Sequence, residues 1–264
     1  MFKKGHYWTL VTVILILLLS SCSEYQKIYK SSDFDLKYKK AMEYYDNEDY
    51  IRSSSLLLEL ISVYKGTESA EEINYRYAYT YYYQDDYTMA GYYFRNFVAT
   101  FPSSKYADEC AFMNAFCYYQ SSPNPNLDQT NTMKAIDELQ IFINRHPSSP
   151  RVEECNKLID ELNDKLVQKS YNSAKLYYDL GEYRASITAL NNSLLEYPDT
   201  QFREELLYMI LRSSYELARN SVPEKIKARY EQTSEAYYKL IDEFPETEYL
   251  KDAQRLFEAA QKAL

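Results

Sequence analysis

The chain has 264 residues with 31 tyrosines and only four glycines, and it carries 30 basic against 39 acidic residues. This length allows one or two globular units with a sizeable core, whereas four glycines supply too few tight turns for a β-sandwich or a nucleotide-binding α/β sheet. The acidic balance, a formal charge of -9 with a pI near 5.0, argues against nucleic-acid binding, which needs a clustered basic surface.

The first 22 residues are typical of an export signal. Two lysines precede a run of about ten apolar residues, 10–19, which is short for a membrane-spanning helix. The tetrapeptide L-S-S-C at 19–22 has the order of a bacterial lipobox. An uncleaved anchor helix or a buried core segment is the alternative. Resemblance to bacterial lipoprotein signals implies that residues 1–21 are a cleaved signal peptide. It also implies that Cys22 carries lipid on its thiol and its new amino terminus.

Cleavage would remove Trp8, the one tryptophan, and leave 28 basic against 39 acidic residues. Residues 22–32 are largely polar and lack a clear period, so we expect a lipidated flexible tether there. No later segment approaches 18 consecutive apolar residues, so we expect a soluble body that its lipid holds at the membrane.

An aromatic-turn-acidic pattern occurs five times along the rest of the sequence. In each copy an aromatic or histidine residue is expected to end a helix: Tyr64, Phe101, His146, Tyr197 and Phe244. Proline follows all but the first of these anchors and stops the helix. Three residues after each anchor stands a hydroxyl residue that is expected to cap the next helix: Thr67, Ser104, Ser149, Thr200 and Thr247.

Counting back from each anchor gives one amphipathic helix per copy. A small residue stands eleven positions earlier: Ser53, Ala90, Ala135, Ser186 and Thr233. A large residue stands seven positions earlier: Leu57, Phe94, Leu139, Leu190 and Tyr237. This spacing predicts an apolar stripe on an α-helix, with the small residue where a neighbouring helix approaches closely.

Another helix precedes each of these across a short polar turn, so we expect about five helical hairpins. The helical pattern from Arg151 to about Leu180 is long enough to span roughly 45 Å and to link two sub-bundles. We therefore expect an N-terminal repeat lobe, 33–150, with three repeats, and a C-terminal lobe, 151–264, with two repeats and a capping helix. The final apolar stripe, 249–264, either caps the solenoid or docks a partner.

The order of small residue, large residue and aromatic-proline, with A-K-L-Y-Y-D-L-G-E-Y-R-A at 174–185, resembles the tetratricopeptide repeat. The resemblance covers roughly 33–264 and implies an all-α, tetratricopeptide-like α-solenoid. The anchors are 37, 45, 51 and 47 residues apart, so the repeats are longer than the usual ~34 residues. Lipobox, mature length and repeated junction together resemble the BamD family of outer-membrane assembly lipoproteins.

The BamD resemblance implies a non-enzymatic lipoprotein subunit of the outer-membrane β-barrel assembly complex, anchored by lipid and facing the periplasm. Its carboxyl-terminal repeats would scaffold the barrel-inserting subunit, and its amino-terminal repeats would bind unfolded barrel proteins. A repeat-built periplasmic adaptor lipoprotein for peptidoglycan-associated or envelope-division complexes is the alternative. Ser23 follows Cys22 without an aspartate, which is compatible with outer-membrane sorting.

The first helix of each hairpin lines the concave groove of a solenoid, where extended partners lie. Tyrosines of the second hairpin, comparable tyrosines of the first and one arginine are expected to form a peptide groove: Tyr38, Tyr45, Tyr75, Arg76, Tyr79, Tyr82 and Tyr83. Tyrosine offers an apolar ring with a hydroxyl, and arginine pairs with carboxylates such as the terminal carboxylate of a barrel protein. Packing between hairpins is the alternative for each tyrosine.

The stretch 206–264 is expected to dock the barrel-inserting subunit. Arg203, Arg212 and Arg219 lie along the helix after the fourth anchor and are expected to pair with acidic groups of that partner. Ordinary solvated surface is the alternative for these arginines.

Three cysteines remain after lipidation of Cys22. Cys110 and Cys117 are seven residues apart on one helix, about 10.5 Å, which exceeds the reach of a disulfide. Cys110 and Cys155 share one apolar repeat position, so we interpret them as small buried hydrophobes and not as a redox or metal pair.

No residue pattern points to catalysis. His146, the one histidine of the mature protein, stands at an aromatic anchor position, and the isolated glycines form no phosphate-cradling loop. Acidic pairs recur at one repeat position, which indicates helix-start electrostatics and not an acid/base pair. We expect no enzymatic activity, no metal and no cofactor beyond the lipid on Cys22.

Overall fold

The computed structural model describes residues 24–264, and every regular element among them is an α-helix. Contacts divide the described residues into two compact units: those up to Ser122 with Thr130–Ile159, and Pro123–Gln129 with Asp160–Leu264. The predicted signal peptide and the lipid-attachment residue Cys22 lie outside the described residues. The all-α prediction is confirmed.

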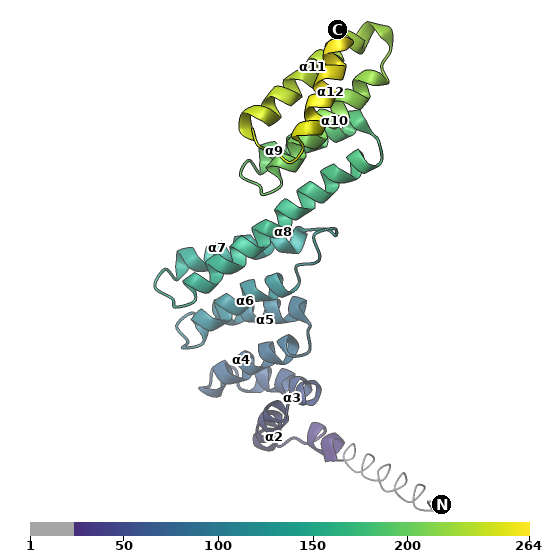
Figure 1. Ribbon diagram of the computed structural model, residues 1–264. Helices are drawn as coiled ribbons and strands as arrows, with labels where there is room; N and C mark the ends of the chain where they lie inside the picture. Colours follow the sequence, from purple (N-terminus) through teal and green to yellow (C-terminus); the bar gives the residue numbers. More distant parts are fainter. Residues whose placement is uncertain (1–23) are drawn as a thin grey trace, which may run out of the picture. The chain divides into compact units, whose positions relative to one another are not determined.

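The first unit contains three consecutive helical hairpins. They are formed by α2 (Phe34–Asp46) with α3 (Tyr50–Val63), α4 (Ser69–Tyr82) with α5 (Tyr87–Thr100), and α6 (Ala107–Gln120) with α7 (Thr130–Arg145). Successive hairpins pack through α3 against α4 and through α5 against α6 (Figure 1). This order confirms the predicted tetratricopeptide-like solenoid.

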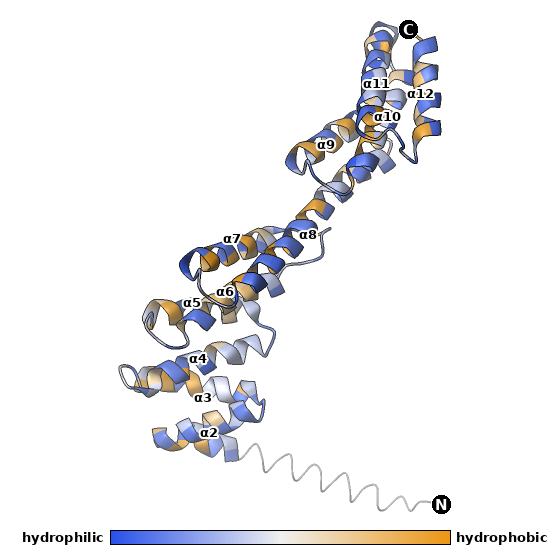
Figure 2. Ribbon diagram, turned by 60° about the vertical axis from the view of Figure 1, so that its left-hand side comes forward, coloured by the Kyte–Doolittle hydropathy of each residue, from blue (hydrophilic) through white to orange (hydrophobic). Residues whose placement is uncertain are grey.

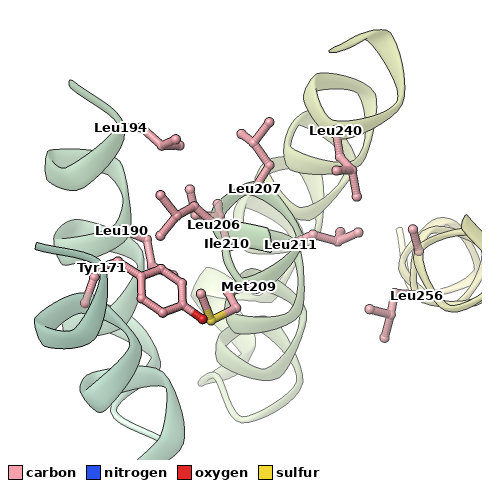
Figure 3. Close-up of a cluster of buried hydrophobic side chains, with 12 residues drawn as sticks. Tyr171, Leu190, Leu194, Leu206, Leu207, Met209, Ile210, Leu211, Leu240 and Leu256 are labelled. Atoms are coloured by element: carbon pink, nitrogen blue, oxygen red, sulfur yellow. The ribbon is translucent and has the colours of Figure 1, made fainter. Parts of the chain in front are cut away.

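The second unit is formed by five helices. The long helix α8 (Val152–Asp179) has 28 residues, of which those from Asp160 belong to this unit. It is followed by α9 (Tyr183–Glu196), α10 (Arg203–Arg219), α11 (Pro223–Glu243) and α12 (Leu250–Lys262). Leu190 of α9, Leu206 and Leu211 of α10, Leu240 of α11 and Leu256 of α12 share one core (Figure 3).

The small and large positions of the repeat lie inside the hairpins. The five small residues are fully buried, and so are the large residues Leu57, Phe94, Leu139 and Leu190. Hydroxyl groups at small positions find partners: Ser53 donates to the carbonyl of Ala41 at 2.9 Å, and Ser186 and Ser213 share a hydrogen bond of 3.0 Å. Hydrophobic residues alternate with hydrophilic ones along each helix (Figure 2), as an amphipathic helix requires.

The aromatic anchors end helices as predicted, but the hydroxyl residues do not cap the next helix. Tyr64, Phe101, Tyr197 and Phe244 are the C-caps of α3, α5, α9 and α11. The hydroxyls of Ser104, Thr200 and Thr247 instead accept the backbone N–H two residues later, at 3.2 Å. The capping prediction was wrong because a tight turn separates each hydroxyl residue from its helix.

The polar turns inside the hairpins share one backbone feature. Glu48, Asp85 and Gly181 have positive φ angles of 61°, 59° and 73°, and each stands two residues before the second helix of its hairpin. Aspartate then caps two of these helices, since Asp49 and Asp86 accept the N–H groups of Arg52 and Met89. The left-handed residue reverses the backbone direction and the aspartate starts the next helix.

The N-terminal segment differs from the flexible tether predicted for residues 22–32. Residues 24–29 are helical, and Ile28 is buried in the core of the first hairpin beside Ala41 and Leu56. Tyr25 and Ile28 are three residues apart and therefore share one side of this short helix. A stripe of only two residues is too short to be recognised as a period in the sequence.

Candidate functional site

Helix α4 carries most of the surface that we call the N-terminal aromatic face, which comprises Tyr38, Tyr45, Tyr75, Arg76, Tyr79, Tyr82 and Tyr83. Its tyrosine side is turned toward α6. The ring of Tyr75 stacks on that of Tyr106 with centroids 4.3 Å apart, and the ring of Tyr82 lies 6.4 Å from Phe116. The third and second hairpins therefore meet along this row of rings.

Tyr79 is a buried member of the N-terminal aromatic face. It is only 7% exposed, its hydroxyl donates to the Glu109 carboxylate at 2.6 Å, and its ring makes an edge contact with Phe94 at 4.9 Å. Tyr83 is 48% exposed and stacks at 4.7 Å on Tyr50. Of the predicted groove tyrosines, Tyr83 is thus displayed to solvent and Tyr79 is packed between hairpins.

The two predicted tyrosines of the first hairpin join the same face. The hydroxyl of Tyr38 donates to Glu72 at 3.0 Å, and the ring of Tyr45 makes edge contacts with Tyr50 and Tyr83 at 5.6 and 6.3 Å. Burial raises the pKa of Tyr38, Tyr45, Tyr75 and Tyr79 above the ordinary value. These hydroxyls are therefore neutral at physiological pH, and the rings form an apolar surface edged with hydroxyl groups.

Arg76 is already engaged within the protein. Its guanidinium lies 4.8 Å from the ring of Tyr45 and donates to Asp46 and Glu72, each at 3.0 Å. A carboxylate from a partner would have to displace one of these two acids. Arg76 therefore holds the ring of Tyr45 and joins the first hairpin to the second.

Sequence reasoning missed three members of this surface. Tyr50, Tyr106 and Phe116 all contact the predicted residues. Tyr50 begins α3, the second helix of the first hairpin, so a rule that considers only the first helix of each hairpin omits it. Tyr106 stands just before α6, the first helix of the third hairpin. Their aromatic character at repeat positions is the signal that was available.

The other aromatic side of α4 is core. Tyr77 is 2% exposed, and its hydroxyl lies 3.1 Å from that of Tyr81. The ring of Tyr93 on α5 packs against Tyr77 and Tyr81 at 4.7 and 5.1 Å. These rings pack α4 against α5 within the second hairpin, and Tyr77 also joins the core of the first hairpin with Leu56 and Leu60.

The second unit places the three predicted arginines in different settings along α10. Arg203 is bound by Glu243 through two hydrogen bonds of 2.6 and 3.0 Å, and Arg219 pairs with Glu216 at 2.8 Å. Arg212 is exposed and forms no ion pair with the part of the protein that the structure describes. Of the three arginines, Arg212 is therefore the one that can bind an acidic partner without breaking an ion pair inside the protein.

Aromatic rings form the floor beneath Arg212. Its guanidinium lies 5.9 Å from the ring centroids of both Tyr178 and Tyr208. Tyr208 is fixed in turn by stacking at 4.0 Å on Tyr249 and by donating to Asp252 at 2.8 Å. Burial is the main reason why the pKa of Tyr208 rises to about 12, so this floor is uncharged. A cation over two neutral rings is suited to a carboxylate from another protein.

Replacing Arg203 by alanine is expected to lower the free energy of unfolding by less than about 1 kcal/mol, because solvent screens a partly exposed ion pair. Hydrogen bonding to Arg203 holds the pKa of Glu243 below its ordinary value. The contribution is therefore present above the ordinary carboxyl pKa and disappears as the pH falls through the pKa of the folded state. Urea denaturation of both proteins at neutral and acidic pH measures this. A difference that persists in acid would contradict the assignment, and exposed Arg184→Ala is the control.

The thiols support the interpretation as buried hydrophobes. Cys110, Cys117 and Cys155 are free and buried. Burial raises the pKa of Cys117 to about 12 and that of Cys155 to about 11, and it raises the pKa of Cys110 as well. Buried thiols of high pKa react poorly with oxidants and metals. Among residues 24–264, no cluster of three histidine, cysteine or acidic residues is placed to hold a metal ion.

His146 acts at a hairpin junction. Its ring stacks on Phe142 at 4.9 Å, and its Nδ1 lies 2.8 Å from a carboxylate oxygen of Asp108 on α6. Ser149 donates to the same carboxylate at 3.0 Å. These contacts give the histidine a role in packing the third hairpin.

Comparison with known proteins gives one family. The YfiO family model, described as an outer membrane lipoprotein, matches residues 31–229, which is most of the sequence. No curated protein matches the sequence. The match runs from just before α2 into the first turns of α11, so it includes the N-terminal aromatic face and all three predicted arginines. Among the described helices none is long and apolar enough to cross a membrane.

Proposed function

The chain belongs to the YfiO family of outer membrane lipoproteins, and we propose on this premise that it is a non-enzymatic subunit of the outer-membrane β-barrel assembly complex. In this role it scaffolds the barrel-inserting subunit and binds unfolded barrel proteins. The family match over residues 31–229, which confirms the resemblance to the BamD family, is the observation that carries the proposal. Lipid on Cys22 attaches the protein to the outer membrane, and its helical body faces the periplasm.

The N-terminal aromatic face supports the proposed binding of unfolded substrates. Tyr45, Tyr50, Tyr82 and Tyr83 form connected ring contacts, with Tyr83 exposed to solvent. Unfolded barrel strands alternate apolar and polar side chains. Tyrosine rings can pack against the apolar side chains while their hydroxyls hydrogen-bond the backbone, and they lose little conformational freedom on binding.

Arg212 supports the proposed docking of the barrel-inserting subunit by the second unit. An exposed guanidinium above Tyr178 and Tyr208 favours an acidic partner group. Arg203 pairs with Glu243 and Arg219 pairs with Glu216, so we assign these two arginines to stabilising the second unit and not to binding a partner. Docking within 206–264 should therefore depend more on Arg212 than on either neighbour.

Photocrosslinking in intact cells tests both surfaces with matched controls. A photoreactive amino acid at Tyr83 is expected to capture unfolded barrel proteins, whereas one at Tyr92, which is 56% exposed on α5 but outside the face, is not. The same residue at Arg212 is expected to capture the barrel-inserting subunit, with Tyr238 on α11, 53% exposed, as the control.

The captured proteins decide between the two functions. Barrel precursors at Tyr83 and the barrel-inserting subunit at Arg212 support the assembly role. Capture only of cell-wall or division proteins would favour the periplasmic adaptor for peptidoglycan-associated or envelope-division complexes. Equal capture at Tyr83 and Tyr92 would mean that the aromatic face has no special affinity for these proteins.

A further inference from the structure

The helical body of the protein begins almost at the lipid-attachment residue. Ile28 of the segment 24–29 is 5% exposed and packs with Ala41 and Leu57. The ring of Tyr25 makes an edge contact with Tyr44 at 5.9 Å, and the guanidinium of Arg52 lies 5.6 Å from the Tyr25 ring. These contacts fix the segment on the first hairpin through both α2 and α3.

The sequence leaves little distance between this segment and the lipid. Only Ser23 separates Cys22 from Glu24, so two residue steps span about 7 Å at most. A lipidated Cys22 at a bilayer surface therefore holds residues 24–30 within the headgroup region or directly beside it. The following inference rests on the lipid attachment proposed above.

The charge of this part of the protein is opposite to that of the rest. Residues 24–40 contain five lysines and three acidic residues, whereas residues 41–264 contain 23 basic and 36 acidic residues. Lys37 and Lys40 are paired with Glu59 and Glu43. The other three, Lys27, Lys30 and Lys39, are exposed and form no ion pair with any described residue.

Tyr29 adds an exposed aromatic ring to the same segment. It is 47% exposed although the ammonium group of Lys37 lies 5.9 Å from its ring centroid. Amphipathic aromatic rings are favoured at the headgroup level of bilayers, and lysines near the surface are attracted to anionic lipids. The short segment thus carries one exposed aromatic ring, Tyr29, together with the exposed Lys27 and Lys30, which is the composition of a lipid-facing surface.

We propose that Tyr29, Lys27 and Lys30 form a membrane-contact surface that holds the first hairpin against anionic phospholipids. The lipid on Cys22 supplies the attachment, while this surface fixes the distance of the first hairpin from the bilayer. The N-terminal repeat is then presented at the membrane and does not move freely on a tether.

A single tryptophan tests the proposal on the full-length, processed protein. The mature protein contains no tryptophan because Trp8 is the only one, so Tyr29→Trp provides a unique fluorophore. The protein is reconstituted into vesicles of phosphatidylcholine and phosphatidylglycerol that contain brominated lipid. We expect quenching at position 29 to be at least about threefold stronger than in the control Tyr238→Trp, since only a ring at headgroup level reaches the bromine. Equal or absent quenching would overturn the proposal.

Charge reversal separates the surface from the lipid anchor. In the Tyr29→Trp background, Lys27→Glu with Lys30→Glu should reduce quenching to the control level while the protein still floats with the vesicles. Unchanged quenching would overturn the role of the lysines. Failure of the parent protein to float would instead count against lipidation, that is, against the proposed function. An unchanged far-ultraviolet circular dichroism spectrum shows that each variant is folded.

Discussion

Phe94→Ala is expected to destabilise the first unit by about 3–5 kcal/mol, since a fully buried ring is lost and leaves a cavity. The ring of Phe94 also makes the edge contact at 4.9 Å that supports Tyr79. Loss of Phe94 should therefore loosen the row from Tyr75 to Tyr83 and weaken substrate capture at Tyr83. Urea denaturation followed by circular dichroism measures the change in the free energy of unfolding.

The repeat provides a matched substitution in the other unit. Leu190 occupies the repeat position of Phe94 and is also fully buried, so Leu190→Ala should cost about 2–5 kcal/mol in the second unit. Capture at Tyr83 should survive this substitution if the two units unfold separately. Exposed Tyr92→Ala on the same helix as Phe94 should change stability by less than about 0.5 kcal/mol. A Phe94→Ala effect as small as that of Tyr92→Ala would show that the core tolerates the cavity by collapse.

The fold could be predicted largely from the spacing of a few residue types. The order of small residue, large residue and aromatic anchor occurs five times. Misplacing one copy by a residue would leave the other four to define the repeat. The long helix α8 was also predictable, because the apolar period runs without a break from Arg151 to about Leu180. Five matching copies therefore predict a helical-repeat fold, which a single amphipathic helix would not.

The exposure of individual tyrosines could not be predicted in the same way. Tyr79 and Tyr83 are four residues apart on one helix side, yet one is buried and the other is half exposed. The difference comes from α6, whose Glu109 accepts the hydroxyl of Tyr79, and from the end of α4 at Tyr82, beyond which Tyr83 extends. Contacts between hairpins are not encoded in the period of a single helix.

The acidic partners of the three arginines could not be predicted from the sequence either. Arg203 and Glu243 are 40 residues apart and meet because α10 packs on α11. Arg212 lies nine residues further along α10, where Tyr178 and Tyr208 lie beneath it. The three arginines along one helix were similar candidates in the sequence, whereas of these three only Arg212 forms no ion pair with residues 24–264.

Cys22→Ala is expected to remove the protein from the outer-membrane fraction, with a decrease of at least about tenfold. Each buried methylene of an acyl group contributes about 0.8 kcal/mol, so several acyl groups on one residue give stable attachment. No described helix can replace that attachment by crossing the membrane. The variant also loses the lipobox cysteine, so the apolar run 10–19 and Trp8 should remain with the protein.

Mass and fluorescence together measure this outcome. The parent protein should have the mass of residues 22–264 plus lipid and no tryptophan emission, whereas Cys22→Ala should retain the emission of Trp8. Cys110→Ala provides the matched control, because it removes a thiol that is buried in α6 and should leave membrane attachment intact. If Cys22→Ala stays in the outer membrane as fully as Cys110→Ala, the attachment must come from another part of the protein. In that case Tyr29 and the lysines of residues 24–40 would be the first region to examine, since they bring aromatic and basic groups to the same end of the protein.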